Sequence, residues 1–268
     1  MIALLLGLAC VPERTPTPSD TDTDSDTDTD FDTDVDVVPP LHEDWEWTWE
    51  NPLPHGSDLT AIWGLSDDAL WAVGENAVTM TWDGNTWTPG QLPLQEDFED
   101  GHYDLWGWTA DDLAIGTAPG VVMWDPIDDR ANAVRTSPPF SKVIWGFDNR
   151  DVWAVGGGVI TRTFRYEGSF WQEVSFPSMS RPTDMFGTAR ERVMVVGWTG
   201  EYALFDGSNW TLSTTPTGVN LNGVFSAGGD APFRIIGEQG ELWTYDGVNL
   251  TKDASLADVT YSGIHGVS

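Results

Sequence analysis

The chain has 268 residues, of which 40% are apolar and 12% aromatic, so it can bury a sizeable core. Its formal net charge of −31 argues against nucleic acid and anionic membrane surfaces as partners, because both are negatively charged. The single cysteine, Cys10, excludes a disulfide framework within one chain, and the four histidines form no HxH or HExxH pattern. We therefore expect no metal site and no cofactor.

The chain opens with MIALLLGLAC, an apolar run that ends in a small residue and Cys10. This segment resembles a bacterial lipoprotein signal peptide, which is cut before the cysteine that is then lipidated. It departs from that family at Gly7, where Leu is preferred, and in lacking a basic residue before the apolar run. The alternatives are an ordinary secretory signal or a buried apolar N-terminus. The resemblance implies a signal peptide over residues 1–10 with Cys10 as the lipid anchor.

Residues 11–40 follow as a segment rich in Asp, Thr and Pro, with nine Asp between Asp20 and Asp36. They offer too little apolar surface to offset the entropy lost on ordering, and their like charges repel. We expect a disordered tether. Val11 stands where related lipoproteins carry the Asp that retains them in the inner membrane. The resemblance therefore implies anchoring at the outer membrane of a Gram-negative bacterium, on either its periplasmic side or the cell surface.

The remaining residues, 41–268, repeat a short phrase whose first copy is AIWG at 61–64. The spacings of its aromatic position are 43, 39, 41, 39 and 40 residues. The copies occupy this position with Trp63, Trp106, Trp145, Phe186, Phe225 and, in the sixth, His265. Repeats are expected to start near 59, 102, 141, 182, 221 and 260.

Each copy continues with an acidic or polar turn, an apolar strand that ends in Gly, and a third strand that commonly ends in Asp-Gly. A fourth segment often carries Trp, as at Trp87, Trp171 and Trp210. Four short strands in about 40 residues predict antiparallel hairpins and a propeller blade. The paired Trp of each copy are expected to pack between blades. The array resembles β-propeller repeat proteins of the broad kelch, WD40 and sialidase-type group, without the signature of any one subfamily.

The fold class expected is therefore all-β: a β-propeller with five full blades and a partial closing sixth. Residues 45–54, WEWTWENPLP, match the fourth strand of a blade, and the last residues, VTYSGIHGVS, match a first strand. Either these two strands share a vestigial closing blade, or the chain is cut short at one or both ends.

Propellers bind ligands where loops converge near the central channel, so the loops between second and third strands and those between blades are the candidate sites. Trp198 is the foremost candidate, because an aromatic residue in a loop is less readily explained as core. The full set of candidate contacts is Glu75, Asn76, Trp198, Glu238, Gln239, His102 and Arg181.

The primary hypothesis is a non-catalytic, monomeric binding or scaffold module for a glycan or protein, attached to the membrane only by its lipid. The alternative is a glycoside hydrolase or lyase with paired carboxylates in the central cleft. No catalytic residue is assigned, because the sequence contains no catalytic motif and an acidic chain produces chance carboxylate pairs.

Overall fold

The computed structural model describes residues 57–92, 102–118, 120–128, 130–134, 141–156, 160–253 and 259–266. Every described residue lies within Thr48–Ser268, the second of the two units into which the chain divides. The expected signal peptide, Cys10 and the tether of residues 11–40 lie outside the described residues.

Five antiparallel sheets of four strands make up the described chain, and neighbouring strands in each sheet are consecutive in sequence. Blade 1 contains β1 (Leu59–Ser66), β2 (Ala69–Gly74), β3 (Val78–Trp82) and β4 (Trp87–Gln91). Blade 2 contains β5 (His102–Thr109), β6 (Asp112–Thr117), β7 (Val121–Asp125) and β8 (Arg130–Val134). Blade 3 contains β9 (Ser141–Asp148), β10 (Asp151–Gly156), β11 (Arg162–Tyr166) and β12 (Trp171–Val174).

Blade 4 contains β13 (Pro182–Ala189), β14 (Arg192–Gly197), β15 (Glu201–Phe205) and β16 (Trp210–Thr214). Blade 5 contains β17 (Leu221–Phe225), β18 (Phe233–Gly237), β19 (Leu242–Tyr245) and β20 (Leu250–Lys252). Short 3-10 turns join the second and third strands of three blades: η1 (Glu75–Ala77), η3 (Trp198–Gly200) and η4 (Glu238–Gly240). The predicted all-β class and five four-stranded repeats are confirmed.

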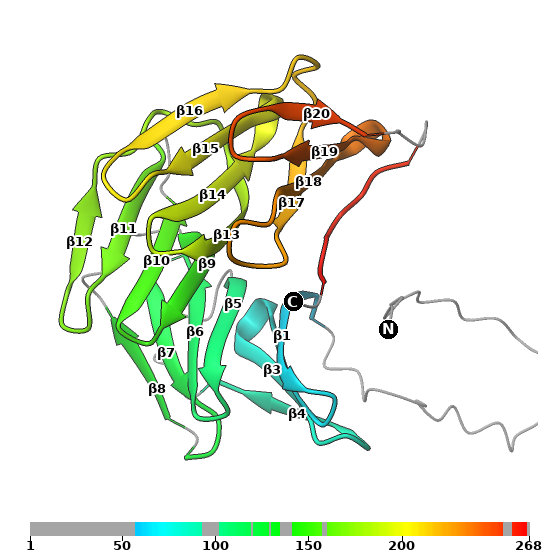
Figure 1. Ribbon diagram of the computed structural model, residues 1–268. Helices are drawn as coiled ribbons and strands as arrows, with labels where there is room; N and C mark the ends of the chain where they lie inside the picture. The colour runs from blue at the N-terminus through cyan, green and yellow to red at the C-terminus, as the bar shows by residue number, and fades with distance from the viewer. Residues whose placement is uncertain are drawn as a thin grey trace, which may run out of the picture. The chain divides into compact units, whose positions relative to one another are not determined.

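The first strands of successive blades contact one another, in the order β1, β5, β9, β13 and β17. In Figure 1 the five sheets follow one another around an arc, with these strands on its inner side and strands such as β12 and β16 on its outer side. The loops that join second to third strands therefore lie at one end of the blades. The turns that join third to fourth strands lie at the other.

Glycine after the repeated aromatic residue makes room for the aromatic ring of the preceding blade. A Cβ placed on Gly107 would lie 2.7 Å from the Trp63 ring, and one on Gly187 would lie 2.7 Å from the Trp145 ring. Side chains do not approach each other so closely, so only glycine fits. The Trp-Gly and Phe-Gly pairs of the sequence are thus contacts between blades.

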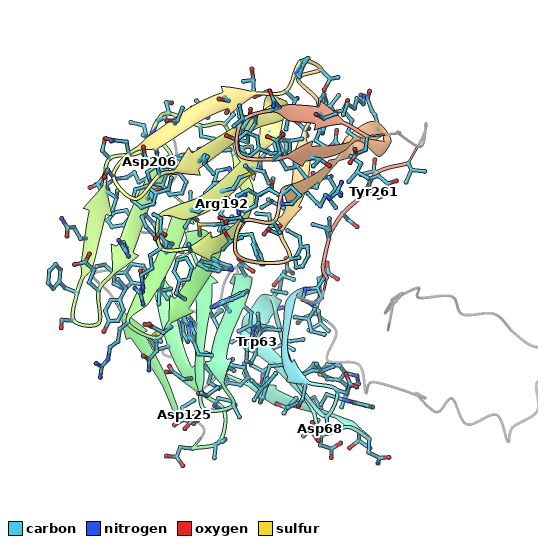
Figure 2. All side chains as sticks on the ribbon, viewed as in Figure 1. Trp63, Asp68, Asp125, Arg192, Asp206 and Tyr261 are labelled. Atoms are coloured by element: carbon cyan, nitrogen blue, oxygen red, sulfur yellow. The ribbon has the colours of Figure 1, made fainter. Side chains whose placement is uncertain are left out.

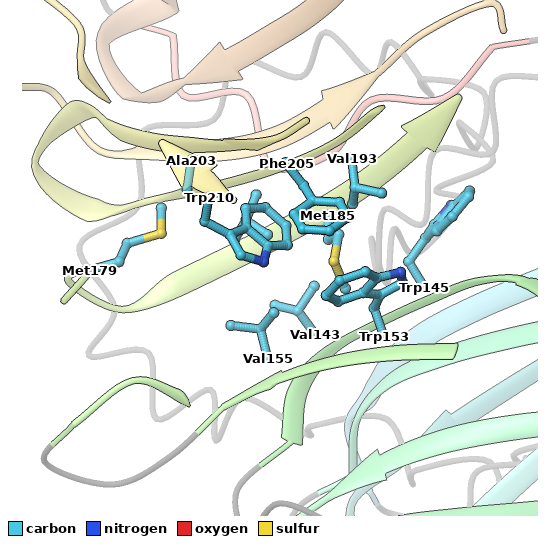
Figure 3. Packing of buried hydrophobic residues seen from close by; sticks show 11 residues of the cluster. Val143, Trp145, Trp153, Val155, Met179, Met185, Val193, Ala203, Phe205 and Trp210 are labelled. Atoms are coloured by element: carbon cyan, nitrogen blue, oxygen red, sulfur yellow. The ribbon is translucent and has the colours of Figure 1, made fainter. Parts of the chain in front are cut away.

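The second aromatic residue of the repeat fills the space between blades, as the sequence predicts. Between blades 3 and 4, the Trp153 side chain is fully buried and meets the rings of Phe205 and Trp210 edge-on, at centroid distances of 5.0 and 5.5 Å (Figure 3). Comparable clusters lie between blades 1 and 2, 2 and 3, and 4 and 5. Burial of such rings is the main apolar contribution to stability.

In the Asp-Gly turns between third and fourth strands, the aspartate side chain accepts hydrogen bonds from backbone N–H groups of the turn. Asp206 Oδ1 accepts hydrogen bonds from the backbone N–H groups of Ser208 and Asn209, both at 2.8 Å, at the tip of blade 4 (Figure 2). Gly207 has φ of +96°, a conformation that favours glycine. The two backbone hydrogen bonds lower the pKa of Asp206. Asp-Gly is therefore a local turn signal.

The sixth copy of the repeat lies beside blade 5 in extended form. Asn222 Nδ2 donates to the Tyr261 carbonyl oxygen at 2.7 Å, and the Tyr261 N–H donates to the Gly237 oxygen at 3.2 Å. The rings of Phe225 and His265 lie 6.0 Å apart. Figure 2 labels Tyr261 on this segment. Residues 259–266 thus continue the inner row of aromatic residues, although they form no strand.

Replacing Gly187 by Ala is expected to destabilise the protein by roughly 1–3 kcal/mol, because the new Cβ would overlap the Trp145 ring. Chemical denaturation measures the change. Gly263→Ala is the matched control, since a Cβ there meets nothing within 4 Å. The effect of Gly187→Ala should shrink in a Trp145→Leu background, and an undiminished effect would contradict the packing explanation.

Candidate ligand-binding face

Three loops at one end of the blades share a single backbone conformation. In η1, η3 and η4 a glycine in extended conformation is followed two residues later by a residue in the left-handed region. These residues are Asn76 (φ 56°), Thr199 (φ 58°) and Gln239 (φ 55°). The same fold of the chain therefore presents different side chains in blades 1, 4 and 5.

Each of these turns is held to the segment that precedes the first strand of its own blade. The Glu75 N–H donates to the Asp58 oxygen at 3.0 Å, and the Glu238 N–H donates to the Asn220 oxygen at 3.0 Å. The Trp198 N–H donates to the oxygens of Ser180 at 3.1 Å and Arg181 at 3.3 Å. In each blade these bonds bring a residue of the turn next to a residue that precedes the first strand. The neighbouring residues are Asp58 and Glu75, Arg181 and Trp198, and Asn220 and Glu238.

In blade 4 these two residues, Arg181 and Trp198, form a cation–π contact. The Arg181 guanidinium lies 4.1 Å from the centroid of the Trp198 ring, and the Trp198 residue remains 38% exposed. Such a contact contributes about 0.5–2 kcal/mol. Arg181 has φ of 39°, which is unusual for a residue other than glycine. The Arg181 guanidinium therefore lies against an exposed indole.

Asn220 joins the turns of blades 4 and 5. Its Oδ1 accepts a hydrogen bond from the Thr199 N–H at 3.0 Å, and its Nδ2 donates to Glu238 Oε1 at 3.2 Å. One amide side chain therefore satisfies a backbone donor in one blade and a carboxylate in the next. Asn220 thus links η4 to the turn that carries Trp198.

A buried carboxylate supports the segment that carries Asn220. Glu241 is 2% exposed, and its oxygens accept hydrogen bonds from Thr217 Oγ1 at 2.8 Å, Trp243 Nε1 at 2.9 Å and Lys252 Nζ at 2.8 Å. Burial works to raise the pKa of Glu241, but these hydrogen bonds and the Lys252 charge together lower it. The Glu241 carboxylate therefore stays ionised and anchors the segment between blades 4 and 5.

The structure brings some of the predicted contacts together and separates others. Arg181 contacts Trp198, and Asn220 links the turn of Trp198 to Glu238, which Gln239 follows in η4. Glu75 and Asn76 occupy the matching turn of blade 1, where Asn76 Nδ2 donates to Ser57 Oγ at 3.0 Å.

One placement was wrong. His102 was expected in a loop between blades but is the first residue of strand β5, because it pairs with Thr117. Its side chain lies outside the described part of the structure.

Sequence reasoning missed two aspartates on the inner strands, Asp104 of β5 and Asp184 of β13. Each Oδ1 accepts the N–H of its own following residue, at 2.9 and 2.8 Å. Each Oδ2 reaches the first strand of the next blade, where it accepts the N–H of Ile144 or Val224, both at 2.8 Å. The signal was present, since Asp occupies the same place in DLWG and DMFG.

Burial raises the pKa of Asp104 and of Asp184 to about 7, against the opposing effect of their backbone hydrogen bonds. Both carboxylates serve as hydrogen-bond acceptors that join neighbouring inner strands. Among the described residues, no three His, Cys, Asp or Glu side chains are grouped to hold a metal ion. The geometry of these acids is therefore that of structural links between blades.

No helix within the described ranges is long and apolar enough to cross a membrane. No protein-family model matches the chain, and no curated protein matches it in sequence.

Solved structures do match. The chain is similar to YCF48 bound to D1 peptide, with 18% identity over 74% of this chain and 68% of that chain, and a TM-score of 0.57. It is also similar to the extracellular domain of BT4673 from B. thetaiotaomicron, with 14% identity and a TM-score of 0.59; the match covers 75% of this chain but only 28% of that one. YCF48 from Cyanidioschyzon merolae matches at 12% identity over 78% of this chain and 89% of that chain, with a TM-score of 0.52. These likenesses establish a β-propeller-type fold.

Stability is expected to fall as pH rises from about 5 to about 7 and then to level off. The folded-state pKa of Asp104 and Asp184 is about 7, above the ordinary value of 3.8, so in this window the folded state holds protons that the unfolded state has released. Melting temperatures at pH 5, 6, 7 and 8 measure the slope. The Asp104→Asn/Asp184→Asn double variant should flatten it, and an equally steep slope in that variant would exclude these groups as the cause.

Proposed function

We propose that this protein is a non-catalytic, exported propeller that binds an extended segment of a partner protein on the face formed by η1, η3 and η4. The observation that carries the proposal is the exposed Trp198 with Arg181 stacked on it. Three turns with similar backbone dihedral angles provide a repeated backbone frame, and their side chains differ from blade to blade. Binding surfaces of repeat proteins have this character, with a constant scaffold and varied contact residues.

A protein segment suits this face better than a glycan. Arg181 covers one face of the Trp198 indole, which leaves at most one face on which a sugar could stack. Tryptophan and arginine are the residue types that most often dominate protein–protein binding energy. YCF48, one of the similar structures, is bound to a peptide. The acids Glu75 and Glu238 supply hydrogen-bond acceptors for backbone N–H groups or basic side chains of the ligand.

Binding is expected to weaken tenfold or more in Trp198→Ala and in Arg181→Ala, because removal of a central aromatic or arginine anchor typically costs more than 1–2 kcal/mol. The full chain would be screened against a displayed library of unstructured peptides, and affinities measured by calorimetry. Phe170→Ala is the matched control, since Phe170 is 58% exposed in the β11–β12 turn at the opposite end of the blades.

Two outcomes would overturn this proposal. The first is binding on a glycan array that is lost in Trp198→Ala, which would make the face a sugar site. The second is release of reducing ends from polysaccharides, which would favour the hydrolase alternative and direct attention to the inner-strand carboxylates.

The proposal includes attachment to the outer membrane through Cys10, with residues 11–40 as the spacer. An extended chain covers at most about 3.3–3.6 Å per residue, so this segment can hold the propeller well away from the lipid surface. The net charge of −31 acts in the same direction, because anionic lipid repels it. BT4673, another of the similar structures, is an extracellular domain.

Full-length protein expressed in a Gram-negative host is expected to incorporate radiolabelled palmitate and to fractionate with outer membranes. Cys10→Ser should abolish the labelling and remove the protein from the outer-membrane fraction, because Cys10 carries the only thiol in the chain. Thr15→Ser in the spacer is the control. Unlabelled wild-type protein that is nevertheless exported would replace the lipoprotein assignment with an ordinary secretory signal.

A further inference from the structure

Arg181 differs from every other base that lies over an aromatic ring in the described residues. Each of the other five also donates a hydrogen bond to an oxygen atom of the chain. These five bases are Arg162, Arg165, Arg190, Arg192 and Lys252. The Arg181 guanidinium lies 4.1 Å from the centroid of the Trp198 ring, but its N–H groups donate to no oxygen in the described part of the chain. Arg181 therefore keeps its hydrogen-bond donors available for a ligand.

Blade 3 shows what kind of acceptor a stacked arginine of this protein binds. The Arg165 guanidinium lies 5.0 Å from the centroid of the Trp153 ring, and its Nε and Nη2 donate to the two carboxylate oxygens of Asp151 at 2.7 and 2.9 Å. A guanidinium that lies over a ring still has its N–H groups in its own plane, where they match a carboxylate with two parallel hydrogen bonds. The Arg181–Trp198 pair has the stacked half of this arrangement and lacks the carboxylate.

The backbone on both sides of the Arg181 side chain is held in place. The Ser180 N–H donates to the Glu201 carboxylate, and the Arg181 carbonyl oxygen accepts the Trp198 N–H at 3.3 Å. Arg181 itself is exposed and has φ of 39°, a conformation that a residue other than glycine keeps only where its surroundings hold it. The guanidinium is therefore positioned before a ligand arrives, which lowers the entropy lost on binding.

The charges around Arg181 limit the ligand to a single negative charge at this point. Glu238 is joined to the turn of Trp198 through Asn220, and the chain as a whole has a net charge of −31. Both repel a group of charge −2, such as a phosphate, more strongly than a carboxylate of charge −1. One carboxylate without a second acid beside it is therefore the acceptor that fits Arg181.

We propose that the partner segment carries an aspartate or glutamate side chain whose carboxylate binds in the plane of the Arg181 guanidinium, as Asp151 binds Arg165. Trp198 supports the guanidinium from its face. This inference rests on the proposed function, because it names the class of side chain that the same face recognises. Arg181 is then the residue that determines specificity, and Glu238 disfavours a second acid next to the first.

The test is a double-mutant cycle between the full chain and its peptides. Peptides selected from the displayed library are resynthesised with both termini blocked, and each acid is replaced by its amide. At one position the replacement should weaken binding about tenfold to the wild type but only about twofold to Arg181→Gln, because both changes remove one bidentate contact. Arg150→Gln is the control, since it removes the same charge in the β9–β10 turn at the other end of the blades and should keep the tenfold difference. An equal effect of the amide in wild type and Arg181→Gln would overturn the inference and leave the binding face intact.

A second probe tests the same contact without a selected peptide. The Nε–Hε resonance of Arg181, identified by its loss in Arg181→Lys, should shift on millimolar additions of acetyl-Gly-Glu-Gly-amide and stay in place with the Gln counterpart. No shift with the Glu peptide would overturn the inference. A larger shift with inorganic phosphate at equal ionic strength would also overturn it and assign the site to phosphate groups. A shift with the Glu peptide in a protein that binds nothing in the library would support the carboxylate site and contradict the proposed function.

Discussion

At two of the interfaces between blades, the inner aromatic ring of one blade contacts a glycine of the next, and this contact sets the distance between the two sheets. Where Trp145 meets Gly187, no side chain intervenes, so the two inner strands approach closely. The rings themselves form a row, with centroid distances of 5.4 Å from Trp106 to Trp145, 5.8 Å from Trp145 to Phe186 and 5.2 Å from Phe186 to Phe225. At the other two interfaces, between blades 2 and 3 and between blades 4 and 5, Asp104 and Asp184 accept hydrogen bonds from the N–H groups of Ile144 and Val224.

The two ends of the blades use polar residues differently. Near the turn between the first and second strands of blade 3, charged side chains form salt bridges. Arg165 donates two hydrogen bonds, of 2.7 and 2.9 Å, to the buried Asp151. Arg190 of the next blade binds Asp148 at 2.7 Å and also binds Asp151. At the other end, Trp198 and the turn residues around it keep exposed surface on a rigid backbone. The first arrangement stabilises the array, and the second leaves groups available for a ligand.

The sequence predicts the fold well because its strongest signals are local. Asp-Gly fixes a turn through one side chain, and the spacing of Trp63, Trp106 and Trp145 reports the repeat directly. The site is predicted only in part. Trp198 was recognisable as an aromatic residue in a loop, but its stacking with Arg181 and the bridge made by Asn220 depend on side chains from separate segments that the fold brings together. Asp104 was missed because the role of a carboxylate in an apolar strand cannot be inferred until the strand that donates a hydrogen bond to it is known.

The aromatic row also has a direction, because its rings become smaller along the chain, from Trp63 through Phe225 to His265. In the described part of the array the main contacts of each blade are with its neighbours along the chain, so nearest-neighbour couplings dominate its stability, and smaller rings bury less area in each coupling. Blade 5 is then the blade that separates most easily from the array. A ligand that spans Trp198 and Glu238 would bind across the coupling between blades 4 and 5, and by mass action it would suppress this local opening.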